Sequence, residues 1–285
     1  MKNLDPVNLS APSATLLQRR SDELRIAILD MTYRAKGGHL GGSFSVIDVL
    51  TALYLRVMRH RPTHPEWPER DRIVFSKGHS CLALYNVLAE CGYFPRHHLE
   101  RYCVDDGLFA GHPERHLVPG VEATTGSLGH GLPIAVGMAL ASRIDRADYR
   151  VFAVLGDGEL NEGSVWEGFM AGSQHRLDNL TVIIDSNKLE SLGRVEDILS
   201  IEPLGARLSA FGWSVREVDG HDMPRIVEAM EAVPFEIGKP SAIIAHTVKG
   251  KGVSFMENVT MWHYRAPTEQ EWIEARNELE ARLSR

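Results

Sequence analysis

The chain has 285 residues, 44% hydrophobic and 24% charged, and these values are typical of a globular protein with a substantial core. They exclude a disordered chain, a collagen-like chain and a small disulfide-stabilised scaffold. The 31 Lys and Arg residues stand against 38 Asp and Glu residues, and the net charge of −7 disfavours a general nucleic-acid-binding protein, because such proteins need a cationic face.

The N-terminal part of the sequence predicts a long helix, a loop and a strand. Helical spacing over residues 16–35 places Arg and Asp residues on one face and four apolar side chains on the other: Leu17, Leu24, Ile28 and Met31. The Pro-dense segment 61–68 is typical of a structured loop. The apolar run 73–75 is typical of a buried strand.

Apolar runs and helical segments then alternate to the end of the chain. Further strands are expected at residues 151–155, 180–184, 213–218 and 242–245, and their Val and Ile content suits strands buried on both faces. Further helices are expected at residues 134–144, 165–175, 223–233 and 268–285; the first is rich in small side chains and the last is polar. This alternation predicts the α/β class, a parallel sheet with helices on both faces. No internal boundary or repeat is visible, so we expect a single domain over residues 1–285.

Cysteine usage and the first residues bear on the compartment. The three cysteines, Cys81, Cys91 and Cys103, form no CxxC pair and are typical of reduced thiols. Residues 1–6 contain no apolar leader segment, and no continuous run of about 18 apolar residues occurs. We therefore expect a soluble, cytoplasmic protein that does not bind membranes.

The most informative segment is Gly156-Asp157-Gly158, which follows the strand at 151–155. Ligands of open parallel sheets bind at the carboxyl ends of strands, and two glycines allow backbone N–H groups to approach a phosphate. In isolation such a segment is more often a tight turn. However, Asn187 follows the next strand 30 residues later, and a strand–helix–strand unit of that length would return it beside Asp157. Carboxylate, amide and carbonyl oxygens suit Mg²⁺, with two phosphate oxygens and a water completing the octahedron.

The pattern resembles the cofactor motif of thiamine-diphosphate enzymes, and nearly the whole chain resembles the corresponding domain of transketolases. Four further segments resemble transketolase motifs in the family's order: Lys36-Gly37-Gly38-His39-Leu40-Gly41, Asp71-Arg72-Ile73-Val74-Phe75-Ser76-Lys77-Gly78-His79, Gly111-His112-Pro113-Glu114 and Thr124-Thr125-Gly126-Ser127-Leu128-Gly129-His130-Gly131. Two positions depart from the family pattern, Leu40 in place of Pro and His130 in place of Gln. The resemblance implies the diphosphate-binding (PP) fold.

The resemblance also assigns roles to individual residues. It implies that Asp157, Asn187 and the carbonyl of Leu189 hold Mg²⁺. It implies that thiamine diphosphate is contacted by a larger set: His79, Gly126, Ser127, Leu128, Gly156, Asp157, Gly158, Glu162 and Asn187. The loop 247–252 after the last strand adds Lys249 to the expected cofactor contacts, because its glycines and lysines suit an anion; the alternative is a solvated basic turn. Glu162 and Glu167 match acidic residues that link paired active sites across a subunit interface.

Histidines are the expected proton-transfer groups. The resemblance places His39, His79 and His112 near the reacting carbon and the sugar hydroxyls, and each lies in a Gly-containing loop. An imidazole can both give and take protons near neutral pH. His263 follows Trp262 as in a Trp-His-Gly motif of the family, but Tyr264 replaces the Gly. The other histidines that we considered are expected to be ordinary surface or core residues: His60, His64, His97, His98, His175 and His246.

Two departures concern substrate and partner. Tyr102-Cys103-Val104 stands where many transketolases have Phe-Arg-Gln, which makes a ketose or acceptor outside the common set an option. The resemblance covers only the diphosphate-binding domain, whereas orienting the reactive ring of the cofactor needs a second protein surface. We therefore expect the N-terminal subunit of a split transketolase, paired with a C-terminal subunit in an α₂β₂ heterotetramer that acts on sugars or sugar phosphates.

Other functions remain open at this stage. The same domain occurs in deoxyxylulose-phosphate synthases and 2-oxo-acid decarboxylating enzymes, although the Gly-His and Gly-His-Pro-Glu motifs favour ketol transfer. A catalytically silent scaffold subunit is a further alternative, and the intact Asp157 and Asn187 pair argues against it. A nicotinamide-binding Rossmann domain is disfavoured because no Gly-x-Gly-x-x-Gly follows a strand.

Overall fold

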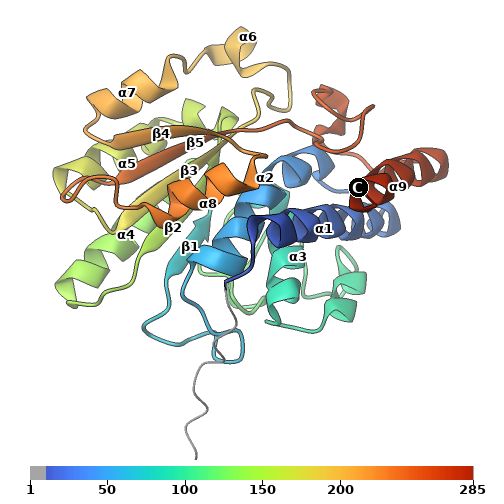
Figure 1. The fold of residues 1–285 in the computed structure, drawn as a ribbon, viewed down its shortest axis with the longest axis horizontal. Coiled ribbons are helices and arrows are strands. Elements are labelled where there is room, and N and C mark those ends of the chain that lie inside the picture. The colour runs from blue at the N-terminus through green and yellow to red at the C-terminus, as the bar shows by residue number, and fades with distance from the viewer. Residues whose placement is uncertain (1–10, 285) are drawn as a thin grey trace, which may run out of the picture.

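The strands predicted from the apolar runs form one parallel sheet in the computed structural model, which describes residues 11–284 (Figure 1). Its strand order is β1-β2-β3-β5-β4. The strand bounds are β1 Arg72–Phe75, β2 Val151–Gly156, β3 Leu180–Ser186, β4 Ser214–Asp219 and β5 Ser241–His246. The chain therefore has the α/β fold that the alternation of elements indicates.

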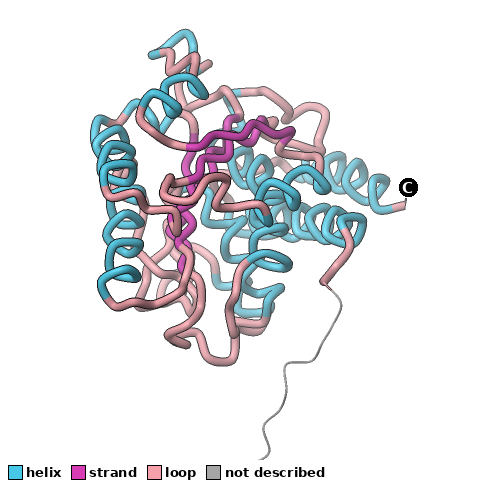
Figure 2. Tube along the Cα trace, turned by 60° about the vertical axis from the view of Figure 1, so that its left-hand side comes forward, coloured by secondary structure: helices cyan, strands magenta, loops and turns pink. Residues whose placement is uncertain are grey.

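Helices cover both faces of the sheet, as Figure 2 shows from a second direction. The helix bounds are α1 Ala14–Ala35, α2 Leu40–Ala52, α3 Cys81–Cys91, α4 Gly131–Ile144, α5 Gly163–Gln174, α6 Val195–Leu199, α7 Leu204–Ala210, α8 Met223–Glu231 and α9 Glu269–Leu283. Alternate residues of a strand point to opposite faces. Phe152 and Val154 accordingly belong to the apolar cluster that contains α1, α2 and α3, whereas Val151 and Ala153 belong to the one beneath α4 and α5. The molecule thus has three layers and a core on each side of the sheet.

One predicted strand differs from the expectation of burial on both faces. In β4 the residues are half-buried or exposed, whereas every residue of β2 and β3 is buried. Strand β4 lies at the edge of the sheet beside β5 alone, and unlike β1 at the opposite edge it carries charged residues that are exposed, among them Arg216 and Glu217. An edge strand needs fewer apolar residues than a central one.

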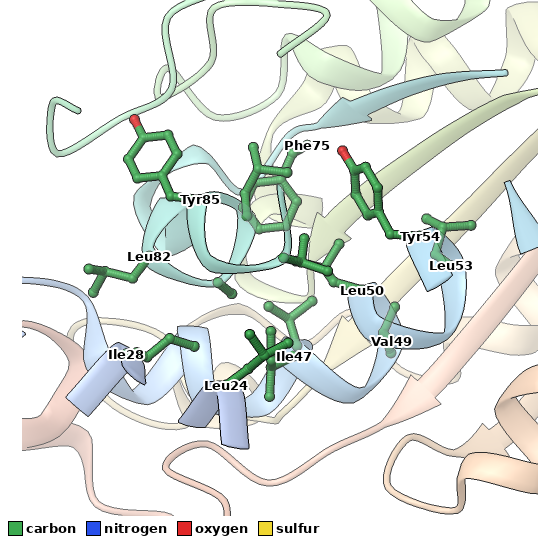
Figure 3. Packing of buried hydrophobic residues seen from close by; sticks show 14 of the residues in the cluster. Leu24, Ile28, Ile47, Val49, Leu50, Leu53, Tyr54, Phe75, Leu82 and Tyr85 are labelled. Carbon is green, nitrogen blue, oxygen red and sulfur yellow. The ribbon is translucent and has the colours of Figure 1, made fainter. Parts of the chain in front are cut away.

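The apolar face of helix α1 packs into the core, as its periodicity indicates, whereas its polar face differs from the expectation. Leu24 and Ile28 belong to the same buried apolar cluster as Ile47 and Leu50 of α2, and Figure 3 shows these side chains within that cluster. The expectation that its Arg and Asp residues lie opposite, toward solvent, is wrong for one pair. Arg25 is 0% exposed and Asp22 is 6% exposed. Both residues belong to a buried charge cluster between α1 and α2.

Helices α2 and α3 were not among the predicted elements. All residues of α2 are buried, and nearly all of α3 are as well. A helix that is buried all round shows no alternation of apolar and polar faces, so the 3.6-residue period that reveals α1 is absent.

Within residues 11–284, one helical segment, 40–57, is long and apolar enough to cross a membrane, and 89% of its residues are buried inside the protein. Its composition is therefore that of a central core helix.

Capping hydrogen bonds stabilise the N-termini of α1 and α9. Ser13 accepts a hydrogen bond from the Leu16 amide at the start of α1, and Thr268 and Glu271 form a capping box at the start of α9. The indole of Trp272 stacks on Tyr33 with ring centroids 5.0 Å apart and donates to Asp30 at 2.8 Å. The predicted polar C-terminal helix therefore packs along α1.

Residues 1–6, on which the expectation about an apolar leader rests, and Arg285 lie outside the described residues.

Candidate active site

The carboxyl ends of four parallel strands open into a cavity of about 240 Å³. The loop after β1 contributes Lys77 and His79, the loop after β2 contributes Asp157, the loop after β3 contributes Asn187, and the loop after β5 contributes Lys249. Most of the predicted site residues line this cavity: His39, His79, His263, Gly126, Leu128, Gly156, Asp157, Gly158, Asn187, Leu189 and Lys249. The sheet thus brings together residues that are far apart in the sequence.

Asp157 and Asn187 meet as the strand–helix–strand spacing predicts. Strands β2 and β3 are paired in register, with Gly156 opposite Asp185, so the two loops leave the sheet side by side. The carboxylate of Asp157 accepts hydrogen bonds from the amides of Gly158, at 2.9 Å, and Lys188. Since Lys188 directly follows Asn187, this bond ties one loop to the other. Both side chains are deeply buried, at 2% and 5% exposure.

The amide of Asn187 has a defined orientation. Its nitrogen donates to Asp185 at 3.3 Å and its oxygen accepts from the Leu189 amide at 3.1 Å. The network therefore distinguishes the oxygen from the nitrogen of this side chain. Asn187 and Leu189 line the same cavity as Asp157.

The Lys249 side chain places an ammonium group beside the Leu189 carbonyl. Its ammonium donates to the Leu189 carbonyl at 2.9 Å and contacts Nδ1 of His263 at 2.8 Å. The side chain is 2% exposed, and burial followed by the nearby charge of Lys77 lowers the pKa of Lys249 to about 8. The predicted anion-binding loop after β5 is therefore a buried part of the site, not a solvated basic turn.

Lys77 and Asp185 form a buried ion pair behind the metal-ligand candidates, and our sequence analysis assigned a role to neither. The Lys77 ammonium donates to Asp185 and to the Gly42 carbonyl, while Asp185 also accepts from Ser45 at 2.7 Å and from Thr247. Burial opposes ionisation of Asp185, but the charge of Lys77 outweighs it and lowers the pKa of that carboxyl. An Asp at the end of an otherwise apolar, buried strand is the signal that could have revealed this pair.

Glu159 is a second buried group that the sequence analysis left without a role. Its carboxylate accepts from Ser76, from the Gly129 amide at 3.0 Å and from the Gly156 amide at 3.3 Å. It therefore joins the loop after β2 to the loop that carries Gly126 and Leu128. Burial raises the pKa of Glu159, partly offset by these hydrogen bonds.

Four histidines converge on the mouth of the cavity. The ring of His39 lies 5.2 Å from that of His79, 5.3 Å from that of His263 and 6.0 Å from that of His112, measured between centroids. Tyr264 packs edge-on against His39 with centroids 4.7 Å apart, on the outer side of the cluster. The replacement of the family's Gly by Tyr264 is thus compatible with a position of His263 inside the site.

Three of these imidazoles, those of His39, His79 and His263, are held in their neutral form. Burial, together with the charges of His112, Lys249 and Lys77, lowers the pKa of His39 to about 4. Burial and Lys249 lower the pKa of His263 to about 3, and burial and Lys77 lower that of His79 well below its usual value. A neutral ring has one nitrogen lone pair and one N–H group and can accept or donate a proton, but in His263 the lone pair of Nδ1 already accepts from the Lys249 ammonium.

Some predicted residues lie outside the cavity lining. His112 lies at the mouth and packs against Gly126, whereas Ser127 is exposed on the same loop. Glu162 begins α5 as an exposed residue beside Gly129, and Glu167 is exposed on the next turn. The cofactor contacts predicted for Ser127 and Glu162 therefore have no counterpart among the residues that line the cavity, while exposure leaves both glutamates accessible to another protein surface.

The comparisons with known proteins agree with this geometry. A family model for the thiamine diphosphate-binding domain of transketolase matches residues 17–282. The chain belongs to the transketolase family. One relative, a subunit of the apulose-4-phosphate transketolase of Phocaeicola vulgatus, is 42% identical over 269 residues, which cover 94% of this chain and 95% of that protein. Another, from the 6-deoxy-6-sulfo-D-fructose transketolase of a Clostridium species, is 42% identical over 264 residues, with 93% and 96% covered.

A solved transketolase shows the same domain in a longer chain. The Campylobacter jejuni transketolase superposes with a TM-score of 0.89 at 31% identity, over 94% of this chain and 43% of its own. This chain thus spans about two fifths of that solved transketolase, but nearly the whole length of the relatives named as subunits. As a transketolase diphosphate-binding domain it takes thiamine diphosphate with Mg²⁺ as its cofactor.

The residues of the cavity fit this cofactor. Burial, followed by the charge of Asp185, raises the pKa of Asp157 to about 6, so a cation beside this carboxylate would relieve a real electrostatic penalty. The Leu189 carbonyl already binds a cationic group, the Lys249 ammonium. Among residues 11–284 no cluster of three His, Cys, Asp or Glu side chains could hold a metal by itself. A single carboxylate with amide and carbonyl oxygens suits Mg²⁺ that shares its remaining positions with phosphate and water.

Proposed function

We propose that this chain is the cofactor-binding subunit of a transketolase that transfers a two-carbon ketol unit from a ketose to an aldose. The observation that carries the proposal is the convergence, on one cavity, of an oxygen-ligand set and a histidine cluster. The ligand set is Asp157, Asn187 and the Leu189 carbonyl, and the cluster is centred on His39. The relatives named as transketolase subunits support the same conclusion.

In this proposal the chain binds and orients, and the cofactor supplies an electron sink for breaking a carbon–carbon bond next to a carbonyl. Asp157, Asn187 and Leu189 would hold Mg²⁺, and Gly158 and Lys249, which line the same cavity, would face the diphosphate. Backbone hydrogen bonds already fix the Asp157 carboxylate, so this ligand needs little reorganisation when the metal binds, whereas the Lys249 ammonium has to leave the Leu189 carbonyl.

The neutral histidines would move the protons of the reaction. His39, His79 and His263 are close enough to one another to contact neighbouring hydroxyls of one sugar. His39 and His79 could accept a proton from a hydroxyl at an unprotonated nitrogen, whereas His263, whose Nδ1 accepts from Lys249, could donate its N–H to a developing alkoxide. His112, at the mouth, would meet the part of the sugar that reaches toward solvent.

We further propose that a separate C-terminal subunit, which carries the pyrimidine-binding and C-terminal domains, completes the enzyme in an α₂β₂ assembly in the cytoplasm. The names of the relatives support a partner, because they designate subunits that match this chain over nearly their full length. The exposed Glu162 and Glu167 offer a polar surface for contact between copies. Three free cysteines suit a reducing compartment.

For the substrate we propose a ketose with an anionic end, as a phosphate or a sulfonate. The support is that one relative is named for a sugar phosphate and another for a sulfo sugar. Tyr102-Cys103-Val104, in place of the family's Phe-Arg-Gln, makes a donor outside the common set part of the same proposal.

The test is a donor panel on the chain purified together with its partner subunit. Ketose phosphates, sulfo sugars and pyruvate are each supplied with an aldose acceptor, thiamine diphosphate and Mg²⁺, and the transferred product is identified by mass. We expect ketol transfer from a ketose and no decarboxylation of pyruvate. Decarboxylation of pyruvate without ketol transfer, or full activity of this chain without a partner, would overturn the proposal.

A further inference from the structure

A buried charge cluster lies beneath the cofactor-side loops and has no counterpart in the mechanism above. Arg25 of α1 is fully buried and donates to Asp48 of α2 at 3.1 Å and to Asp22 at 3.0 Å. Burial opposes ionisation of Asp48, but the charge of Arg25 and a hydrogen bond from His221 outweigh it and hold the pKa of that carboxyl well below its usual value. Asp48 is therefore a fixed anion in the core, on the same helix whose N-terminus follows His39.

His221 connects this anion to the cofactor loop. Its Nδ1 lies 2.7 Å from Asp48 Oδ2, and its Nε2 lies 2.9 Å from the backbone nitrogen of Val248. The Val248 nitrogen carries a hydrogen and can only donate, so Nε2 must accept and Nδ1 must carry the proton that goes to Asp48. One tautomer of a neutral ring satisfies both contacts, and the side chain is only 12% exposed.

The Val248 amide lies between two side chains of the site. Thr247 donates to Asp185, the partner of Lys77, and Lys249 donates to the Leu189 carbonyl at 2.9 Å. The turn that carries His221 also packs closely on this loop, because the Gly220 amide donates to the His246 carbonyl at 2.8 Å. A Cβ atom on Gly220 would lie 2.4 Å from the Thr247 methyl group. The orientation of the peptide between Thr247 and Val248 thus decides where both side chains point.

We propose that His221 is a positioning residue for cofactor binding. It transmits the fixed position of Asp48 to the Val248 amide and so holds Thr247 and Lys249 in place for the metal and diphosphate. This role rests on the proposed function, because its consequence is a tighter complex with thiamine diphosphate and Mg²⁺. His221 touches neither, so it affects cofactor affinity and leaves the chemical step alone.

Two measurements on three variants test the proposal. His221→Phe keeps a ring of similar size and removes both hydrogen bonds, whereas His221→Gln keeps one donor and one acceptor. His246→Phe is the matched control, since His246 lies at the end of β5 and forms a similar contact, 2.7 Å from Glu217, but is 44% exposed and does not line the cavity. The first measurement is amide hydrogen exchange of Val248 in the full chain, with the amides of β2 and β3 as an internal reference for folding. The second is the affinity of the two-subunit complex for thiamine diphosphate at saturating Mg²⁺, with kcat at saturating cofactor.

We expect His221→Phe to speed Val248 exchange and to weaken cofactor affinity about 10-fold, as loss of outer partners does at metal sites, with kcat unchanged. His221→Gln should restore much of both, and His246→Phe should change neither. Unchanged Val248 exchange in a folded His221→Phe protein, or unchanged affinity despite faster exchange, would overturn the proposal. If the wild-type complex bound no thiamine diphosphate, the proposed function would fail, while the exchange result would still decide whether His221 holds the loop.

Discussion

The carboxylate of Asp157 shows how a binding site stores unfavourable energy that a ligand later removes. Its pKa is raised from 3.8 to about 6, so the folded chain holds the proton more tightly than the unfolded chain. The contribution of Asp157 to stability is therefore greatest below pH 3.8 and is lost as the pH rises through about 6. Above that range the ionised, buried carboxylate is a cost that a bound cation would offset.

The first prediction follows from this linkage. As the pH rises from about 4 to about 8, the unfolding free energy of the cofactor-free wild type should fall by about 2 kcal/mol relative to that of Asp157→Asn, because an amide does not ionise. Urea unfolding at the two pH values measures the difference. The same variant should lose the stabilisation by thiamine diphosphate and Mg²⁺ that wild type shows. A pH-independent difference between the two proteins would show that burial of Asp157 carries no such penalty.

The second prediction concerns Gly126, whose φ of +148° is rarely adopted by other residues. An added Cβ would lie 2.8 Å from Cδ2 of His112. Gly126→Ala should therefore cost about 1–3 kcal/mol of stability through backbone strain. It should also lower kcat/KM about 10-fold or more, because the displaced His112 no longer meets the substrate correctly. Thermal unfolding and steady-state kinetics of the two-subunit enzyme measure the two effects.

Gly137→Ala is the matched control for that variant. Gly137 lies inside α4 with open space around the new methyl group, so alanine should stabilise the helix by about 0.5–1 kcal/mol without changing kcat. Equal losses of activity in the two variants would contradict the role given to the Gly126–His112 contact.

Residue-level prediction succeeded for the side chains that strand spacing brings together and failed for the buried groups that hydrogen-bond the loops of the site to one another. Asp157 and Asn187 were placed together from their spacing alone, because parallel strands that are neighbours in sequence bring their ends to one edge. Lys77, Glu159 and Asp185 were missed, because their roles consist of contacts between loops distant in sequence. Asp185 could have been singled out as a carboxylate in an apolar strand, but no spacing rule predicts which loops these side chains join.

At the scale of elements, the third prediction concerns the stability that the buried charges between α1 and α2 provide. Arg25→Leu leaves Asp48 in the core without its guanidinium partner and Asp22 with Arg282 alone, and breaking one side of a buried ion pair costs about 3–5 kcal/mol. Arg19→Ala, on the same helix, removes an exposed pair with Glu23 and should cost less than about 1 kcal/mol. Urea unfolding compares the two variants, and a loss below about 1 kcal/mol for Arg25→Leu would show that the cluster is not a stabilising contact.

Elements were predictable when one face met water or when an apolar run was short and rich in Val and Ile. The amphipathic pattern of α1 and the strand runs of β2 and β3 gave correct elements, with bounds within a few residues. Helix α2 escaped because it is apolar on every side, and β4 was expected to be fully buried because sequence alone does not reveal which strand lies at the edge. The burial of Arg25 was missed for a related reason: an arginine on the polar side of a helix is usually solvated, and here α2, α9 and His221 close over the charge cluster.

At the scale of the whole molecule, we propose that the cavity holds one end of the cofactor and that a second protein surface holds the other end. The described residues supply oxygen ligands and histidines, and His112 lies at the mouth of the cavity. The fourth prediction is that the chain alone gives no more than about 1% of the ketol-transfer rate of the two-subunit enzyme, because orienting the reactive ring supplies a large part of the rate. Titrating the partner into a fixed amount of this chain should give saturation, and a rate independent of the partner would contradict it.

The most direct test of the account is the position of the metal ion. Crystals of the two-subunit complex grown with thiamine diphosphate and Mn²⁺ in place of Mg²⁺ give an anomalous signal that locates the ion without assumptions about its ligands. We predict one strong peak within coordination distance of the Asp157 carboxylate, the Asn187 amide oxygen and the Leu189 carbonyl, with the Lys249 ammonium moved off that carbonyl. A cofactor bound with its ion elsewhere, or with no ion at these three oxygens, would contradict the account.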